Sequence, residues 1–104
     1  MCAFKASFSV LFDWDSAKNE ILKDTRQTSF ETIVVHLGRG DVWKNAEHPD
    51  QVRYPGQRLF FVVINDYVYV VPYEIRDAVF WLITIIPSRR ATAEYRKEKP
   101  HEVE

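Results

Sequence analysis

The stretch that decides the fold is LFFVVI-ND-YVYVVP at residues 59–72. Only two polar residues, Asn65 and Asp66, separate its two runs of β-branched and aromatic residues. This spacing predicts a tight hairpin of two antiparallel strands. A third run, VFWLITII at residues 79–86, follows a polar break at 74–78. We therefore expect a three-stranded meander.

Charged residues are rare in this meander. Between Leu59 and Ser88 the only charged residues are Asp66, Glu74, Arg76 and Asp77. We therefore expect the meander to form the core of the protein. Pro72 has no N–H to donate to a neighbouring strand, which predicts that it lies at a strand end or a sheet edge.

The residues before the meander predict a strand and two helices. Residues 4–12 alternate between apolar and polar side chains, which indicates one strand that Asp13 and Asp15 end. Asp15 or Ser16 can cap a helix over residues 17–24, whose apolar stripe is Ala17, Ile21 and Leu22.

A second helix is predicted by apolar residues that share one helical face: Phe30, Ile33, Val34 and Leu37. Thr28 and Glu31 have the spacing of a capping box, and Ser29 is a rival cap. Gly38 and Gly40 can supply the left-handed conformations that end the helix.

The remaining segments complete an α+β prediction. Residues 41–58 are polar and contain two prolines, which predicts a long loop. Ser88 can cap a last helix that runs to about Lys99, and residues 100–104 are expected to be a flexible tail. We expect one domain over residues 1–104, with two N-terminal helices packed on an antiparallel sheet to which residues 1–11 add a strand.

The composition of the 104 residues excludes several classes of protein. Fourteen basic and fifteen acidic residues give a net charge of -1, so no overall basic field favours nucleic acid. A single cysteine, Cys2, excludes internal disulfides and multi-cysteine zinc sites. No apolar run approaches the roughly 20 residues of a membrane span, and a signal peptide is not indicated. We expect a cytoplasmic protein with no cofactor and no contact with a membrane.

The start of the last predicted helix is the most informative site. Arg89 and Arg90 fall in its first turn, where the helix dipole disfavours cations. Two guanidinium groups beside free helix N–H groups can bind a phosphate. Alternatively, both extend into solvent or pair with carboxylates such as Glu94. The segment 89–99 carries a local net charge of +3, which fits either a polyanion site or a solvated helix face.

Other candidate residues lie in the predicted loop and on the predicted strands. His48, next to Glu47, titrates in the range useful for acid–base chemistry, although a loop histidine is usually just exposed. His36 is expected to be packed and His101 lies in the tail, so the scattered histidines predict no metal site. Tyrosines on one strand face (Tyr67, Tyr69, Tyr73) could stack bases, but ordinary sheet packing is the stronger interpretation.

Two segments resemble the BrnT family of bacterial ribonuclease toxins. Phe12-Asp13-Trp14-Asp15, Lys18 and Ser29-Phe30-Glu31 keep the family's spacing of W-D-x-x-K, ten residues and S-F-E. Ile85-Ile86-Pro87-Ser88-Arg89-Arg90-Ala91-Thr92, with Tyr95 beyond, is similar to the family's I-I-S-A-R-K-A-T stretch. Residues 47–58 look like a subgroup of BrnT-like proteins, so the resemblance covers residues 12–96.

The resemblance implies a RelE-like fold and cleavage of mRNA without a metal. It also implies neutralisation by a small DNA-binding antitoxin, through which alone operator DNA is contacted, in a homodimer or heterotetramer. Lys18 and Arg89 match the motif positions best, and Arg58 and Tyr95 match less closely. The chain departs from the family at Thr25-Arg26, where a Lys-His pair is common, and at Ile83, where relatives carry a basic residue.

Two functional hypotheses follow. In the first, Lys18, Arg58 and Arg89 hold the scissile phosphate while the RNA 2′-hydroxyl attacks it, with Tyr95 or His48 transferring a proton. The residues expected to position RNA are Arg90, Arg53, Arg96 and Tyr54. In the second, the protein is a non-catalytic module on the same fold, which binds a partner helix and uses its arginines only to guide association. The neutral total charge favours the second.

Overall fold

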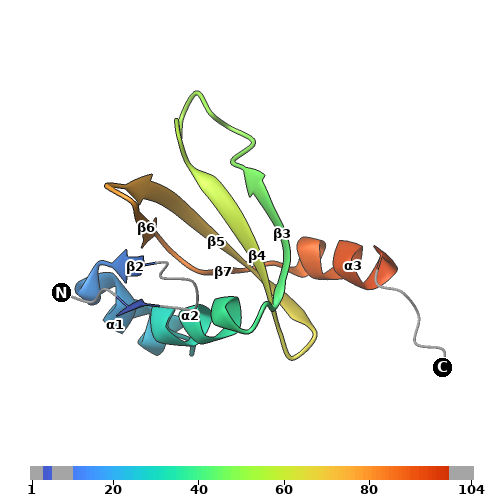
Figure 1. The fold of residues 1–104 in the computed structure, drawn as a ribbon. Helices are drawn as coiled ribbons and strands as arrows, with labels where there is room; N and C mark the ends of the chain where they lie inside the picture. Colours follow the sequence, from blue (N-terminus) through green and yellow to red (C-terminus); the bar gives the residue numbers. More distant parts are fainter. Residues whose placement is uncertain (1–3, 6–10, 99–104) are drawn as a thin grey trace.

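The computed structural model describes residues 4–5 and 11–98, which form three helices and a mixed sheet (Figure 1). The α+β class is therefore confirmed. In chain order the elements are β1 (Phe4–Lys5), β2 (Leu11–Trp14), α1 (Ser16–Thr25), α2 (Phe30–Gly38), β3 (Val42–Glu47), β4 (Arg58–Ile64), β5 (Tyr67–Arg76), β6 (Val79–Leu82), β7 (Ile86–Pro87) and α3 (Arg89–Glu98). The predicted tail lies outside the described residues.

The predicted hairpin is confirmed. β4 and β5 pair antiparallel, with Ile64 opposite Tyr67. Asn65 and Asp66 have φ values of 52° and 66°, the left-handed conformations of the tightest hairpin turn. A second tight turn, at Asp77 and Ala78, joins β5 to β6.

Pro72 lies inside β5, so its predicted place at a strand end or sheet edge is wrong. β5 continues to Arg76, and Pro72 pairs with Leu59 of β4. On its other side the Pro72 carbonyl accepts from the Ile83 amide at 2.9 Å, at the point where the chain leaves β6. The missing N–H of Pro72 therefore faces a break between β6 and β7, where no continuous ladder needs it. The predicted third strand over 79–86 is split by the same break.

The sheet is mixed, so the prediction of an antiparallel sheet is wrong. β2 pairs parallel with β6, and the strand order is β1-β2-β6-β5-β4-β3, with β7 pairing β5. The chain between β2 and β6 is long enough for the crossover that a parallel pair requires.

The single strand predicted over residues 4–12 is also wrong, because β1 and β2 pair antiparallel with Phe4 opposite Phe12. Asp13 lies within β2, since the strand continues to the buried Trp14.

The long loop predicted over residues 41–58 is wrong in its first half. β3 pairs antiparallel with β4 and forms an edge of the sheet. The sequence does not predict β3, because most of its side chains are polar or exposed. A register shift between Val42 and Lys44 also breaks the alternation of apolar and polar side chains. The loop proper is reduced to residues 48–57.

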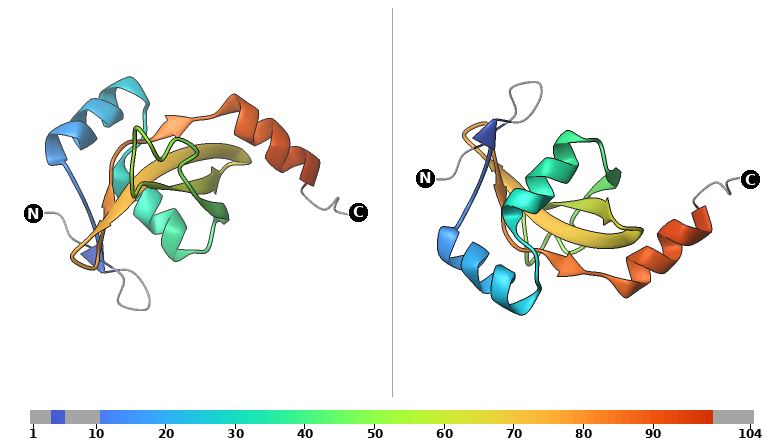
Figure 2. Two further views of the ribbon diagram at one scale, coloured as in Figure 1. Left: turned by 90° about the horizontal axis from the view of Figure 1, so that it is seen from above. Right: turned by 90° about the horizontal axis from the view of Figure 1, so that it is seen from below.

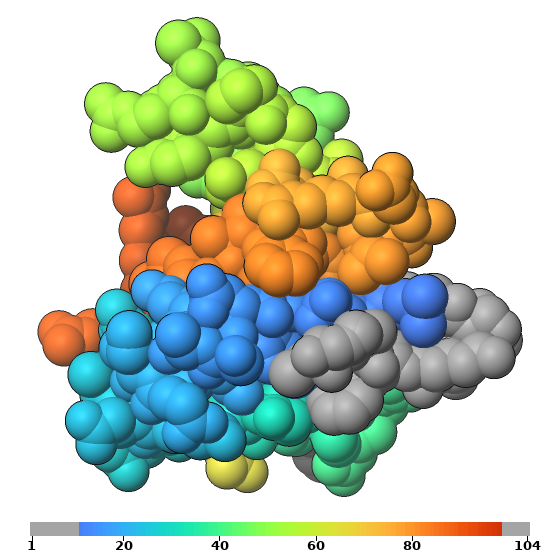
Figure 3. All heavy atoms as spheres, turned by 90° about the vertical axis from the view of Figure 1, so that its left-hand side faces the viewer, coloured from blue at the N-terminus to red at the C-terminus, as the bar shows by residue number. Residues whose placement is uncertain are grey.

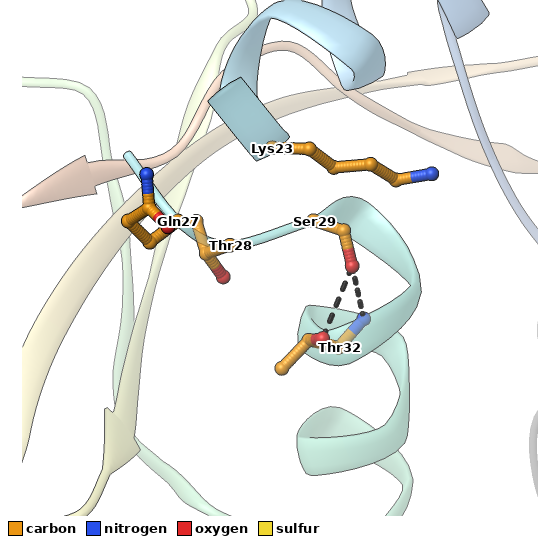
Figure 4. Close-up of a pocket in the computed structure, with 5 residues that line it drawn as sticks. All are labelled: Lys23, Gln27, Thr28, Ser29 and Thr32. Carbon is orange, nitrogen blue, oxygen red and sulfur yellow. Dashed lines mark hydrogen bonds between the residues drawn. The ribbon is translucent and has the colours of Figure 1, made fainter. Parts of the chain in front are cut away.

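The N-caps of α1 and α2 are both residues that the sequence offers as candidates. Asp15 caps α1 by accepting from the Ala17 and Lys18 amides. Ser29 caps α2 by accepting from the Thr32 amide at 3.2 Å (Figure 4), so the rival Thr28 box does not form. Gly40 takes the left-handed conformation after α2, with φ +82°, whereas Gly38 remains helical.

The core lies between the sheet and α2, which runs across one sheet face (Figure 2). Phe30 and Ile33 of α2 are fully buried against Val62 and Val71. α1 and α3 lie toward opposite ends of the molecule in both views of Figure 2. In α1 the predicted apolar stripe is wrong at Ala17 and Ile21, which are both exposed, Ile21 by 55%, while Leu22 is buried.

A buried asparagine joins the two N-terminal helices. Asn19 Nδ2 donates to Glu31 Oε1 at 2.8 Å, and Asn19 Oδ1 accepts from the Phe30 amide at 2.8 Å. The donated hydrogen bond is the main reason that the pKa of Glu31 lies below its ordinary value of 4.5.

This pKa predicts an acid-sensitive contribution to stability. A carboxylate whose pKa is lowered by folding stabilises the folded state above its unfolded pKa, and this stabilisation is lost as the pH falls through the folded pKa. In urea titrations, the free energy of unfolding should therefore fall less steeply below pH 4.5 in Glu31→Gln than in the wild type. Equal slopes in the two proteins would contradict the prediction.

Candidate functional site

An open pocket of about 480 Å³ lies on the sheet face opposite α2. Trp81 lies between Phe80 and Leu82, whose side chains pack on the α2 side, so its ring points to the other face. In Figure 3 the loop 48–57 stands above the segment that carries β6, and α1 lies below it. Residues from all three regions line the pocket: Asp15, Lys18, Gln57, Glu74, Arg76, Trp81, Leu82 and Ile83.

The two cations of this pocket differ in how far they are already used within the fold. Lys18, in the first turn of α1, is half-buried, and its ammonium has no ion pair among the residues that the structure describes. The carboxylate of Asp15 is used as the α1 cap, and Glu74 is paired with Arg76. The Arg76 guanidinium also lies 4.7 Å from the Trp81 ring centroid. Lysine, arginine and an indole in one hollow can bind a phosphate and a base.

The first turn of α3 presents the two predicted arginines to solvent. Ser88 caps the helix as predicted, since its Oγ accepts from the Ala91 amide at 3.0 Å. Arg90 is 92% exposed and lies 3.7 Å from Glu94, one of the alternatives considered above. Arg89 is exposed and forms no ion pair within residues 11–98. The first turn contains no acidic residue.

Arg58 belongs to a separate polar cluster. Its Nε donates to Asn45 Oδ1 and to the Tyr73 hydroxyl, both at 3.3 Å. The Tyr73 hydroxyl in turn donates to Asn45 Oδ1 at 2.9 Å. Asn45 lies on β3 and Tyr73 on β5, so three adjacent strands fix the guanidinium.

The structure does not bring Lys18, Arg58 and Arg89 together. Arg58 alternates with Phe60, which packs in the core, so its side chain lies on the α2 face, opposite the pocket of Lys18. Pro87, two residues before Arg89, pairs with Tyr69, four positions along β5 from Tyr73, the partner of Arg58. At about 3.3 Å per residue this is a separation of about 13 Å along the strand.

Tyr95 and Arg96 of α3 make contacts within the fold. The Tyr95 ring lies 5.5 Å from the Trp43 ring, and both line a hollow with Val63 on the face opposite α2. Arg96 Nε lies 3.3 Å from Asp66 Oδ2, which ties α3 to the β4–β5 turn. These contacts give both residues a structural role alongside the functional roles predicted for them.

The loop candidates form a small group of their own. His48 Nδ1 accepts from the Asp50 amide at 3.0 Å, and its ring lies 4.6 Å from that of Tyr54. Arg53 Nε lies 3.7 Å from Asp50 Oδ2. None of these three side chains lines the pocket of Lys18.

Tyr73 of β5 supports the packing interpretation. Tyr73 is 1% exposed and stacks on Phe60 with ring centroids 4.0 Å apart, so it offers no surface to a base. His36 is packed as predicted, with Nδ1 2.8 Å from Asp41 Oδ2. Among the described residues, no group of three His, Cys, Asp or Glu side chains could hold a metal ion.

A second pocket is lined by residues of α1, α2 and the segment between them (Figure 4), and most of its polar groups already have partners within the fold. Lys23 donates to Glu20, and the hydroxyls of Ser29 and Thr32 are 3.0 Å apart. Gln27 Nε2 donates to the Asp24 carbonyl. This pocket therefore offers less to a ligand than the pocket of Lys18.

The sequence did not single out Asn45, Gln57, Arg76 or Trp81 as site residues. Asn45 lies on a strand that was predicted to be loop, and Trp81 looked like any other residue of the apolar meander.

Between residues 11 and 98, no helix is long and apolar enough to cross a membrane. No family model, curated protein or solved structure matches the chain.

Proposed function

We propose that the protein is the toxin of a type II toxin–antitoxin pair, an mRNA endonuclease with a RelE-like fold that works without a metal. The observation that carries the proposal is the pocket in which Lys18, Arg76 and Trp81 face a common hollow. The Lys18 ammonium suits a phosphodiester, and the Trp81 indole suits an unpaired base. The resemblance to BrnT toxins supports the same class of substrate.

RNA can follow the sheet face opposite α2. The pocket of Lys18 includes Ile83, and the chain continues from there through β7 to the exposed Arg89 and Arg90. Cations at two separate places suit two phosphates of a single strand. In the proposed reaction the RNA 2′-hydroxyl loses its proton and bonds to the adjacent phosphorus, and the bond from phosphorus to the 5′-oxygen breaks. The 5′-oxygen takes up a proton, and a 2′,3′-cyclic phosphate remains. Lys18 stabilises the charge that develops on the phosphate oxygens.

The proposed partner is a small DNA-binding antitoxin, which contacts operator DNA on behalf of the complex. The assembly would be a heterotetramer, or a homodimer when the toxin is alone.

A second candidate function is a non-catalytic interaction module. It is favoured by the separation of Arg58, Tyr95 and His48 from the pocket of Lys18, because general acid–base catalysis needs these groups within reach of one phosphate. In this alternative the exposed cations guide the approach of a partner protein.

Induction of the chain in a bacterial host distinguishes the two functions. The wild type should arrest growth and fragment cellular RNA, whereas Lys18→Ala and Arg89→Ala should abolish both effects. Arg39→Ala is the matched control, since Arg39 is exposed at the end of α2, away from the pocket lining. Intact RNA and normal growth with soluble, folded wild-type protein would favour the interaction module.

A further inference from the structure

The Arg58 cluster consists of Arg58, Asn45 and Tyr73, and it fixes the Arg58 guanidinium through Nε alone. Its Nε shares one proton between Asn45 Oδ1 and the Tyr73 hydroxyl, each 3.3 Å away. The two terminal nitrogens have no hydrogen-bond or ion-pair partner in the described part of the chain. Arginine that is fixed through Nε presents a planar pair of donors that matches two oxygens of a phosphate.

The partners that fix Arg58 are themselves rigid. Tyr73 is 1% exposed, and its ring stacks with those of Phe60 and Phe80, whose centroids are 4.0 Å and 5.4 Å away. Its hydroxyl cannot move without disturbing this stack. Asn45 is bound to the same hydroxyl at 2.9 Å and lies on β3, the strand paired with β4. A flexible surface arginine would lose more side-chain entropy when it bound a ligand.

One carboxylate lies near this guanidinium without neutralising it. Glu47 is the direct partner of Arg58 in the β3–β4 ladder. It is exposed, and no ion pair forms between the two side chains in the described structure. The negative charge of Glu47 opposes an incoming anion and therefore provides a sensitive control.

The cluster is next to the proposed RNA pocket along the chain. Gln57, which immediately precedes Arg58, lines the pocket of Lys18 on the other face. Gln57 is the last residue of the loop 48–57 and Arg58 is the first residue of β4, so a strand of RNA that leaves the pocket at Gln57 reaches Arg58 by passing around the end of β4.

We propose that Arg58 binds a second phosphate of the same RNA strand, and that Asn45 and Tyr73 are positioning residues that aim its guanidinium. This inference rests on the proposed function, since it takes the ligand to be RNA. It adds two residues that contact no RNA themselves and act only through Arg58.

The test is binding of a fluorescent oligouridylate to purified variants, together with the NMR signal of the Arg58 Nε–H group. Arg58→Lys keeps the positive charge but loses the planar pair of donors, and it should weaken RNA binding about tenfold or more. Asn45→Ala and Tyr73→Phe should each weaken binding about threefold to tenfold, and Tyr73→Phe retains the stacked ring. Glu47→Gln should tighten binding, and the exposed control Arg39→Lys should leave it unchanged.

A merely structural role for Asn45 and Tyr73 makes a different prediction. If they act through Arg58, adding Asn45→Ala or Tyr73→Phe to Arg58→Lys should cause no further loss of binding. RNA should also shift the Arg58 Nε–H signal in the wild type. Full additivity in the double variants, or wild-type binding by Arg58→Lys, would overturn the inference.

The outcomes also separate this inference from the proposed function. If Lys18→Ala abolishes binding while Arg58→Lys binds normally, the RNA pocket stands and the second phosphate site fails. If Arg58→Lys weakens binding and Lys18→Ala does not, the pocket fails and the Arg58 site stands. Absence of RNA binding by the folded wild type would reject both.

Discussion

Replacing Asn19 by alanine is expected to lower the free energy of unfolding by about 3 kcal/mol. Asn19 is 3% exposed and makes two hydrogen bonds of 2.8 Å across the α1–α2 junction. Alanine leaves the buried Phe30 amide without its acceptor and the Glu31 carboxylate without its donor. An unsatisfied buried amide costs about 1–3 kcal/mol, and the lost hydrogen bond to the half-buried Glu31 carboxylate adds to this cost.

The matched control is Ile21→Ala in the same helix. Ile21 is the larger and more apolar residue, but it is 55% exposed, and its loss should cost less than about 1 kcal/mol. Urea unfolding followed by circular dichroism measures both variants at pH 7. A larger effect at Ile21 than at Asn19 would mean that α1 is held by its apolar stripe and not by the buried amide.

This contrast shows what could be predicted from the sequence. The hairpin, the α2 face and the caps at Asp15, Ser29 and Ser88 are local features, and each was recognisable from a few neighbouring residues. The role of Asn19 depends on α2, eleven residues away, so nothing around it distinguished it from a solvated polar residue. The parallel pairing of β2 with β6 escaped prediction for the same reason, because sequence patterns do not specify which distant strands become neighbours.

The candidate site was predictable in its chemistry but not in its arrangement. Lys18 and Arg89 were identified as cations, and the structure leaves both without an ion pair among the described residues. That Arg58 lies on the other sheet face depends on the register of β4, which fixes every second side chain. Asn45 could not be identified, because an edge strand with exposed polar residues has the same pattern as a loop.

Replacing Thr92 by valine is expected to lower the free energy of unfolding by about 2 kcal/mol and to loosen α3. The Thr92 hydroxyl accepts from the Val68 amide at 2.8 Å and donates to the Ser88 carbonyl at 2.7 Å. The hydroxyl thus accepts the β5 hydrogen bond that a neighbouring strand would otherwise accept. On the same edge of β5, the Ser88 amide donates to the Val68 carbonyl. Valine has nearly the same shape but leaves the fully buried Val68 amide unpaired.

Thr92→Ser separates the hydroxyl from the packing, because serine keeps both hydrogen bonds and loses one methyl group. It should cost only about 1 kcal/mol. In hydrogen-exchange measurements, Thr92→Val should speed exchange at the Val68 amide and through α3, while the paired amides of β4 stay protected. Under the proposed function, in which Arg89 binds RNA, Thr92→Val should also weaken RNA binding more than Thr92→Ser does, because this hydroxyl anchors the turn of α3 that presents Arg89. Equal protection of α3 in both variants would show that its contacts with Trp43 and Asp66 are enough to hold it on the sheet.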